Sequence, residues 1–208
     1  MTYSHILWDF NGTLFDDVQV NIDTVNAMLV RRGMPVVKDR ETYHSVFGFP
    51  IIDYYRRLGF DLEKENYDDI AVEWAKDYHR FSADASLYPG ITECLKRLSA
   101  AKIPQIVFSA SQKEMLCQQL ALLGILPYFD EILALDTLHA HSKFVIGKAW
   151  FDRTAPAHAV LIGDTQHDYD VAFKIGIDCI LVANGHASYD ALKQLPCPVY
   201  RDIRDIPF

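Results

Sequence analysis

The sequence has no long apolar run, which argues against a transmembrane helix. No stretch approaches the roughly 18–20 consecutive apolar residues that a membrane span needs, and Asp9 interrupts the first apolar segment early. The N-terminal residues also lack the apolar core of a secretory signal. We therefore expect a cytoplasmic protein that does not associate with membranes.

Cysteine and positive charge are also scarce. Reduced, buried thiols are the expected state of the cysteines, because they are few and show no paired spacing; they are Cys94, Cys117, Cys179 and Cys197. The net charge is −8, so the composition does not support a general affinity for nucleic acid or anionic lipid. A small anionic ligand stays possible, since a phosphate group responds to nearby donors rather than to net charge.

What the chain does have is an alternation of apolar runs with helical patterns. This alternation predicts a parallel sheet covered by helices on both faces, an α/β fold of Rossmann-like type. The predicted strands are HILWDF (5–10), IPQIVFSA (103–110), EILAL (131–135), HAVLIGD (158–164) and DCILVAN (178–184). The helices between the later strands are predicted near 112–124, 143–152 and 167–176.

A stretch without strand patterns separates the first strand from the others. Apolar residues recur at helical spacing from Val18 to Leu29 and from Tyr67 to Phe81, and short helices are expected between them. We predict an α/β core formed by residues 1–16 and 86–208, with an all-helical insertion at 17–85. The 208 residues, 50% of them hydrophobic, suffice for a core and a smaller insert.

Polar residues collect where the predicted strands end. Ligands of open parallel sheets bind beyond the carboxyl ends of the strands, so these residues are candidates for one site. They are Asp9, Asn11, Thr13, Ser109, Ala110, Lys143, Asp164 and Asp168. A carboxylate can attack phosphorus, hydroxyl and lysine groups can neutralise phosphate oxygens, and paired carboxylates suit Mg²⁺. The ordered set therefore favours phosphoryl transfer.

Taken one at a time, these residues have simpler explanations. Asp9 and Asp164 could cap turns, Ser109 could cap a helix, and Lys143 could be a solvated residue at a helix start. Those roles do not explain why all of them follow strand ends in one order.

The segments DFNGTL, VFSAS, SKF and GDTQHD resemble the four motifs of the haloacid dehalogenase (HAD) superfamily. The likeness is to its phosphoglycolate-phosphatase-like branch, which has an inserted helical cap. It implies a HAD-like core, a Mg²⁺-dependent phosphatase and a small phosphorylated metabolite as partner. Phosphoglycolate, a sugar phosphate and a nucleotide all fit as substrates, and oligomeric state is not indicated.

The resemblance also implies a role for each matching residue. Asp9 would be the nucleophile and, with the Asn11 carbonyl, Asp164 and Asp168, a metal ligand. Phosphate binding and orientation of Asp9 would fall to Thr13, Ser109 and Lys143, with amide groups of Gly12 and Ala110 contributing. In relatives, the cap loop that matches Gly48–Pro50 helps to select substrate, which makes Phe49 and Arg56 candidates.

Asn11 departs from the phosphatase pattern. Phosphatases of this family carry an aspartate at this position that transfers protons, and asparagine cannot do so. His139, His141 or His167 could supply the proton, or a good leaving group could need none. Alternatively, the protein binds a phosphoryl ligand with weak or no turnover, or deamidation at Asn11-Gly12 restores an aspartate.

Other branches of the superfamily fit less well. Dehalogenases need no metal and usually lack an acidic pair such as Asp164 and Asp168. A phosphonoacetaldehyde hydrolase needs a Schiff-base lysine on the cap, for which Lys38 and Lys64 are the available residues. A phosphomutase would need the missing proton-transfer group even more than a phosphatase does.

Overall fold

The computed structural model describes residues 3–135 and 143–208. Within these residues, one parallel sheet of six strands has the order β3-β2-β1-β4-β5-β6. The strands are β1 (His5–Trp8), β2 (Gln105–Gln112), β3 (Glu131–Leu135), β4 (Ala159–Gly163), β5 (Asp178–Val182) and β6 (Val199–Tyr200). The predicted α/β fold is confirmed, and five of these strands coincide with the predicted ones to within a few residues.

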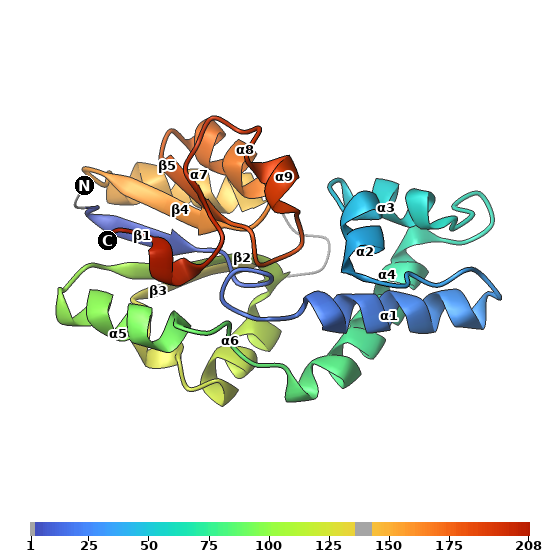
Figure 1. Ribbon diagram of the computed structural model, residues 1–208. Helices are drawn as coiled ribbons and strands as arrows, with labels where there is room; N and C mark the ends of the chain where they lie inside the picture. Colours follow the sequence, from blue (N-terminus) through green and yellow to red (C-terminus); the bar gives the residue numbers. More distant parts are fainter. Residues whose placement is uncertain (1–2, 136–142) are drawn as a thin grey trace.

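Helices cover both faces of this sheet (Figure 1). The two layers of helices are α5 (Ile91–Ala100) and α6 (Lys113–Leu122) on one face, and α7 (Lys143–Thr154) and α8 (Gln166–Ile175) on the other. Two further helical elements follow β5, on either side of β6 in the chain, namely α9 (Tyr189–Leu192) and a short 3-10 helix (Ile203–Asp205).

The side chains of β1 show why the sheet needs two helical layers. Alternate residues of a strand point to opposite faces, and all of β1 from Ile6 onward is buried. Ile6 and Trp8 belong to the hydrophobic cluster that contains residues of α5 and α6. Leu7 belongs to the cluster that contains residues of α7 and α8. A strand that is apolar on both sides can be buried only in the middle of such a sandwich.

A separate group of helices lies beyond one end of the sheet (Figure 1). It consists of α1 (Val18–Arg31), α2 (Arg40–Val46), α3 (Ile51–Leu58), α4 (Tyr67–Phe81) and a 3-10 turn (Ser82–Asp84). These helices share their own hydrophobic cluster, which is rich in tyrosine and phenylalanine. The predicted domain borders, at residues 16/17 and 85/86, stay predictions.

Several late elements were not predicted. Strand β6 has only two residues and follows a proline, so its sequence carries no alternation to detect. It is held by its pairing with Leu181 and Val182 of β5.

Among the helices of residues 3–135 and 143–208, none combines the length and the apolar character that a membrane span requires.

Candidate active site

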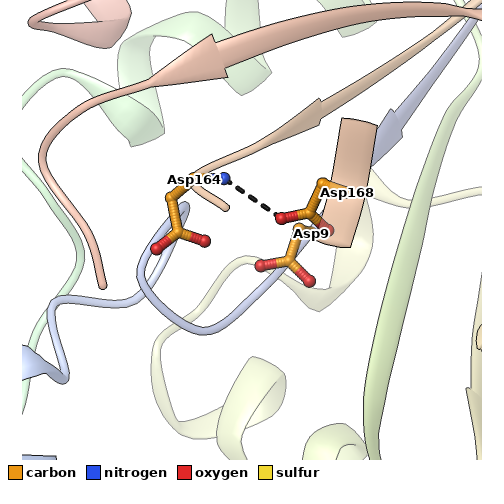
Figure 2. A group of neighbouring side chains, drawn as sticks. All are labelled: Asp9, Asp164 and Asp168. Atoms are coloured by element: carbon orange, nitrogen blue, oxygen red, sulfur yellow. Dashed lines mark hydrogen bonds between the residues drawn. The ribbon is translucent and has the colours of Figure 1, made fainter. Parts of the chain in front are cut away.

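Three aspartates converge at the carboxyl edge of the sheet (Figure 2). Asp9 follows β1, Asp164 follows β4, and Asp168 lies in the first turn of α8. All three are buried, and each has an oxygen within 4.8 Å of the corresponding oxygens of the other two. The neighbouring positions of β1 and β4 in the sheet bring Asp9 and Asp164 together, as predicted from the strand ends.

Asp168 is fixed by the start of its own helix. One of its oxygens, Oδ2, accepts hydrogen bonds from the Thr165 hydroxyl (2.7 Å) and the Thr165 N–H (3.1 Å). The Asp164 N–H also points to this oxygen at 3.3 Å. This is the capping-box arrangement, in which the third helical residue binds back to the residue before the helix. It leaves Oδ1 of Asp168 directed to the site.

Lys143 bridges two of the aspartates. Its Nζ lies 2.5 Å from Asp9 Oδ1 and 2.6 Å from Asp168 Oδ1, and the side chain is only 2% exposed. Burial alone would lower the pKa of Lys143, but the charges of Asp168 and Asp9 outweigh it and raise the pKa. Lys143 is therefore a fixed ammonium group beside Asp9, not a solvated residue at a helix start.

The carboxylates exceed the positive charge available to them. Burial, together with the charge of Asp168, raises the pKa of Asp9 to about 6 against the opposing effect of Lys143. Burial also raises the pKa of Asp164 to about 8, with contributions from Asp9 and Asp168 and against the opposing charge of His186. Buried oxygens that lack a sufficient counter-charge are a suitable donor set for a hard cation such as Mg²⁺. The residues present fit this metal.

The predicted hydroxyl residues lie at the same edge. Thr13 Oγ1 is 3.2 Å from Asp9 Oδ2 and 3.3 Å from Asp164 Oδ1, so this hydroxyl stands between the two carboxylates. Ser109 is 2% exposed, and its oxygen accepts the N–H of Ser111 at 3.1 Å. Ala110, in contrast, is exposed.

Gly12 leaves room for the Asp164 side chain, but its backbone N–H is not free to bind a ligand. Its N–H, expected to bind phosphate, already donates to Asp17 Oδ1 (2.8 Å) and to the Phe15 carbonyl (3.0 Å). Its φ of 73° suits glycine, and an added Cβ would stand 2.2 Å from Asp164 Oδ2. A larger residue here would therefore displace a carboxylate of the site.

The comparisons with known proteins agree with this geometry. A family model described as haloacid dehalogenase-like hydrolase matches residues 6–182. The chain belongs to the haloacid dehalogenase-like hydrolase family. It is 25% identical over 202 residues to a phosphoglycolate phosphatase of Chromobacterium violaceum, covering 90% of this chain and 88% of that protein. A phosphoglycolate phosphatase of Pseudomonas fluorescens is a similar match, with 26% identity over 196 residues, covering 87% of this chain and 70% of that protein.

A second kind of relative is named for a different activity. The chain is 28% identical over 193 residues to the tyrosine-protein kinase PtkA of Mycobacterium tuberculosis, covering 91% of this chain. It spans 65% of the length of that protein. A solved structure of PtkA superimposes with a TM-score of 0.81 at 24% identity, covering 98% of this chain and 95% of that one. At this identity the structural likeness shows the fold alone.

The loop that carries Phe49 lies beside a cavity of about 450 Å³. Phe49 stacks on His167, with ring centroids 4.4 Å apart, and both line the cavity. Arg57 also lines it, whereas the predicted Arg56 is paired with Asp53 at the surface. The helical pattern identified α3 but did not distinguish two adjacent arginines that point in different directions.

Asn11 is held by side chains that the sequence did not single out. Its Nδ2 donates to Asp17 Oδ2 (2.8 Å) and to the Tyr78 hydroxyl (2.7 Å), and its Oδ1 accepts from the Ser111 hydroxyl (2.9 Å). Of the histidines proposed as proton donors, His139 and His141 lie outside the described residues. His167 lines the cavity.

A further histidine, His186, was missed by the sequence analysis. It is 6% exposed, its backbone N–H donates to Asp164 Oδ2 at 2.5 Å, and its ring Nε2 is 3.2 Å from Asp17 Oδ1. Burial opposes its charged form, but Asp17 and then Asp164 raise the pKa of His186 to about 9. His186 follows the predicted strand 178–184, so the strand-end rule, applied to this strand as well, would have found it.

The two lysines named for the phosphonoacetaldehyde hydrolase alternative are both exposed to solvent. Lys38 is exposed, and Lys64, with 82% of its side chain exposed, pairs with Asp61. A Schiff-base lysine needs a desolvated position to lower its pKa, which neither residue has.

Proposed function

We propose that this protein is a Mg²⁺-dependent phosphatase that hydrolyses a small phosphate monoester through an aspartyl-phosphate on Asp9. The observation that carries the proposal is the position of Asp9. Its carboxylate is buried at the meeting point of Lys143, Thr13 and two further aspartates. A carboxylate attacks phosphorus well when it is fixed in place and nearby cations offset its repulsion from the negatively charged phosphate oxygens.

Mg²⁺ would be held by the carboxylates of Asp9 and Asp164 and the carbonyl of Asn11, with Asp168 binding directly or through water. When bound, it supplies Lewis-acid stabilisation of the phosphoryl oxygens and offsets the charge of the aspartates. The raised pKa values of Asp9 and Asp164 support this assignment, because a cation here would favour both ionised forms.

In the first step, an oxygen of Asp9 bonds to phosphorus as the bond from phosphorus to the ester oxygen breaks, and the leaving oxygen takes a proton from solvent water to become the alcohol. Lys143 and the hydroxyl groups of Thr13 and Ser109 hold the phosphoryl oxygens and keep Asp9 aligned. In the second step, water attacks phosphorus as the bond from phosphorus to the Asp9 oxygen breaks, and a proton passes from this water to the solvent. Inorganic phosphate leaves and the Asp9 carboxylate is restored. Asn11 does not transfer a proton in either step, and absence of such help typically costs about 10²–10⁴-fold in rate.

The substrate we propose is a compact phosphate ester. Residues 17–85 would act as a cap that excludes bulk water from the site, and residues 1–16 with 86–208 as the catalytic core. The cavity of about 450 Å³ adjoins this site at Thr165 and His186, and Phe49 and His167 lie along its wall, but Asp9 itself does not line it. A leaving group of small size would extend from Asp9 toward this cavity. The phosphoglycolate phosphatases among the relatives support the same size class.

The test is release of inorganic phosphate from p-nitrophenyl phosphate and a panel of small phosphate esters. Wild type should turn over at least one ester with Mg²⁺ and none with EDTA, and Asp9→Asn should be inactive. ATP belongs in the panel because one group of relatives is named as tyrosine kinases. Mass spectrometry of residue 11 checks that an active preparation has not deamidated. Lack of any Mg²⁺-dependent release from fresh wild type would contradict the proposal.

A further inference from the structure

Asp17 is a fully buried carboxylate that the proposed reaction does not use. It is 0% exposed and stands just before α1. An aspartate at this position commonly accepts hydrogen bonds from the first N–H groups of the helix, but the side chain of Asp17 makes no such bond. Stabilising α1 by capping is therefore not what this side chain does.

The carboxylate turns instead toward the loop that follows the nucleophile. Oδ1 accepts the N–H of Gly12 at 2.8 Å, and Oδ2 accepts Nδ2 of Asn11 at 2.8 Å. Further donors are Tyr78 Oη (2.7 Å), Asn21 Nδ2 (2.9 Å) and His186 Nε2 (3.2 Å). Burial alone would raise the pKa of Asp17, but the charge of His186 and these hydrogen bonds lower it. Asp17 is a buried anion surrounded by donors.

Asn11 is the matching partner of this anion. Both hydrogens of its amide group are used, one by Asp17 and one by the Tyr78 hydroxyl, which itself donates to Asp17. An aspartate at residue 11 could donate neither hydrogen bond. It would also place a second carboxylate about 2.8 Å from that of Asp17, where like charges repel strongly. The residue types at positions 11 and 17 therefore depend on each other.

We propose that Asp17 is a positioning residue, which holds the Asn11–Gly12 turn in the conformation that the phosphate site needs. The carboxyl group that the loop lacks at residue 11 is present at residue 17, in contact with Asn11 and Gly12. This inference rests on the proposed function for its catalytic meaning. It adds that Asn11 is matched to Asp17 and is more than a missing aspartate. The substitution Asn11→Asp by itself is therefore expected to damage the site.

The variants that test it are Asp17→Asn, Asn11→Asp and the exchange Asn11→Asp/Asp17→Asn. Asp16→Asn is the matched control, because Asp16 is the exposed neighbour and its replacement removes the same charge. Binding of inorganic phosphate with Mg²⁺ is measured by calorimetry, and kcat and KM by phosphate release. Thermal melts confirm that each variant is folded at the assay temperature. If Asp17→Asn does not fold, Tyr78→Phe replaces it, since it removes one hydroxyl from the same network.

The direction of the change for Asp17→Asn is decisive. Removing a negative charge near an anion site should strengthen phosphate binding if charge alone matters, whereas loss of positioning weakens it. We expect weakening, and a decrease in kcat, of about tenfold for each single variant, within the range for residues of one hydrogen-bond network. The exchange should recover most of this loss, and Asp16→Asn should leave phosphate binding and kcat unchanged.

The opposite results overturn the inference. These are unchanged or tighter phosphate binding by Asp17→Asn, higher activity of Asn11→Asp alone, or an exchange whose loss is the product of the two single losses. Failure of the proposed function looks different, because wild type would then bind phosphate without hydrolysing any ester. The phosphate-binding comparison would still decide the role of Asp17.

Discussion

The carboxyl edge of the sheet and the hydrophobic cluster shared by α1–α4 bury different kinds of groups. At the carboxyl edge of the sheet, Asp9, Lys143, Asp164 and Asp168 are all buried. The cluster within α1–α4 instead buries aromatic rings, among them Tyr43, which packs against Phe47 and Tyr54. Its ion pairs, such as Arg31 with Glu73, are partly exposed.

Under the proposed function, this difference separates groups that take part in the reaction from groups that stabilise the fold. Removing a charge from water is costly, so buried ion pairs are weak contributors to folding unless every partner is in place. Aromatic packing stabilises without that cost. A fold that retains a buried lysine between two aspartates therefore gives up stability at the site where a charged substrate would bind.

The largest effect should come from breaking the buried group. Lys143→Ala leaves Asp9 and Asp168 without their ammonium partner, so we expect a loss of about 3–5 kcal/mol in unfolding free energy, measured with EDTA by denaturant titration. The control on the same helix is Lys148→Ala, whose half-exposed side chain pairs with Asp152. It should change stability by less than about 0.5 kcal/mol. Equal losses from both variants would contradict the contrast.

Mg²⁺ should stabilise the sheet half through the same carboxylates. At about 100 times its dissociation constant, a ligand that binds only the folded state adds ~2.7 kcal/mol. We expect wild type to show a shift of this size in thermal unfolding, and Asp164→Asn to lose most of it. Asp152→Asn, which removes an exposed carboxylate of α7, should keep the full shift. If Mg²⁺ stabilised Asp164→Asn by the full amount, the metal would have to bind at a site that does not include Asp164.

The smallest effect should come from the ion pairs of the insertion. Arg31 pairs with Glu73 and Asp77, and 46% of its side chain is exposed. Arg31→Ala should lower the unfolding free energy by no more than about 1 kcal/mol. High salt screens this ion pair in wild type, so the difference between wild type and the variant should become smaller. The kcat of the variant should equal that of wild type. A loss as large as that of Lys143→Ala would mean that this network is a main support of the helices.

The predictable part of the site follows from one rule about parallel sheets. Because the carboxyl ends of parallel strands meet at one edge, the sequence alone predicts that Asp9, Asp164 and Lys143 lie close together. The role of Asp17 could not, since it depends on Tyr78 from α4, a residue 61 positions further along the chain. Contacts of this kind arise only when the insertion packs against the loop.

Local details of the fold could likewise not be predicted from the sequence motifs and the apolar spacing. The Gly12 N–H looked free for phosphate, because nothing in the motif shows that the chain turns back at Asp17 to accept it. The same limit explains Arg56 and Arg57, which differ by one step around a helix whose exact rotation the apolar spacing does not fix.

The most direct test of the proposed chemistry is to trap the phosphoryl group on the enzyme. Wild type is mixed with Mg²⁺ and a substrate that it turns over, quenched in acid within the turnover time, and mapped by peptide mass spectrometry. We predict one phosphoryl group on the peptide that contains Asp9, removable by hydroxylamine as expected for an acyl-phosphate and absent from Asp9→Asn. Steady turnover without phosphorylation of Asp9, or with the group on another residue, would contradict the account.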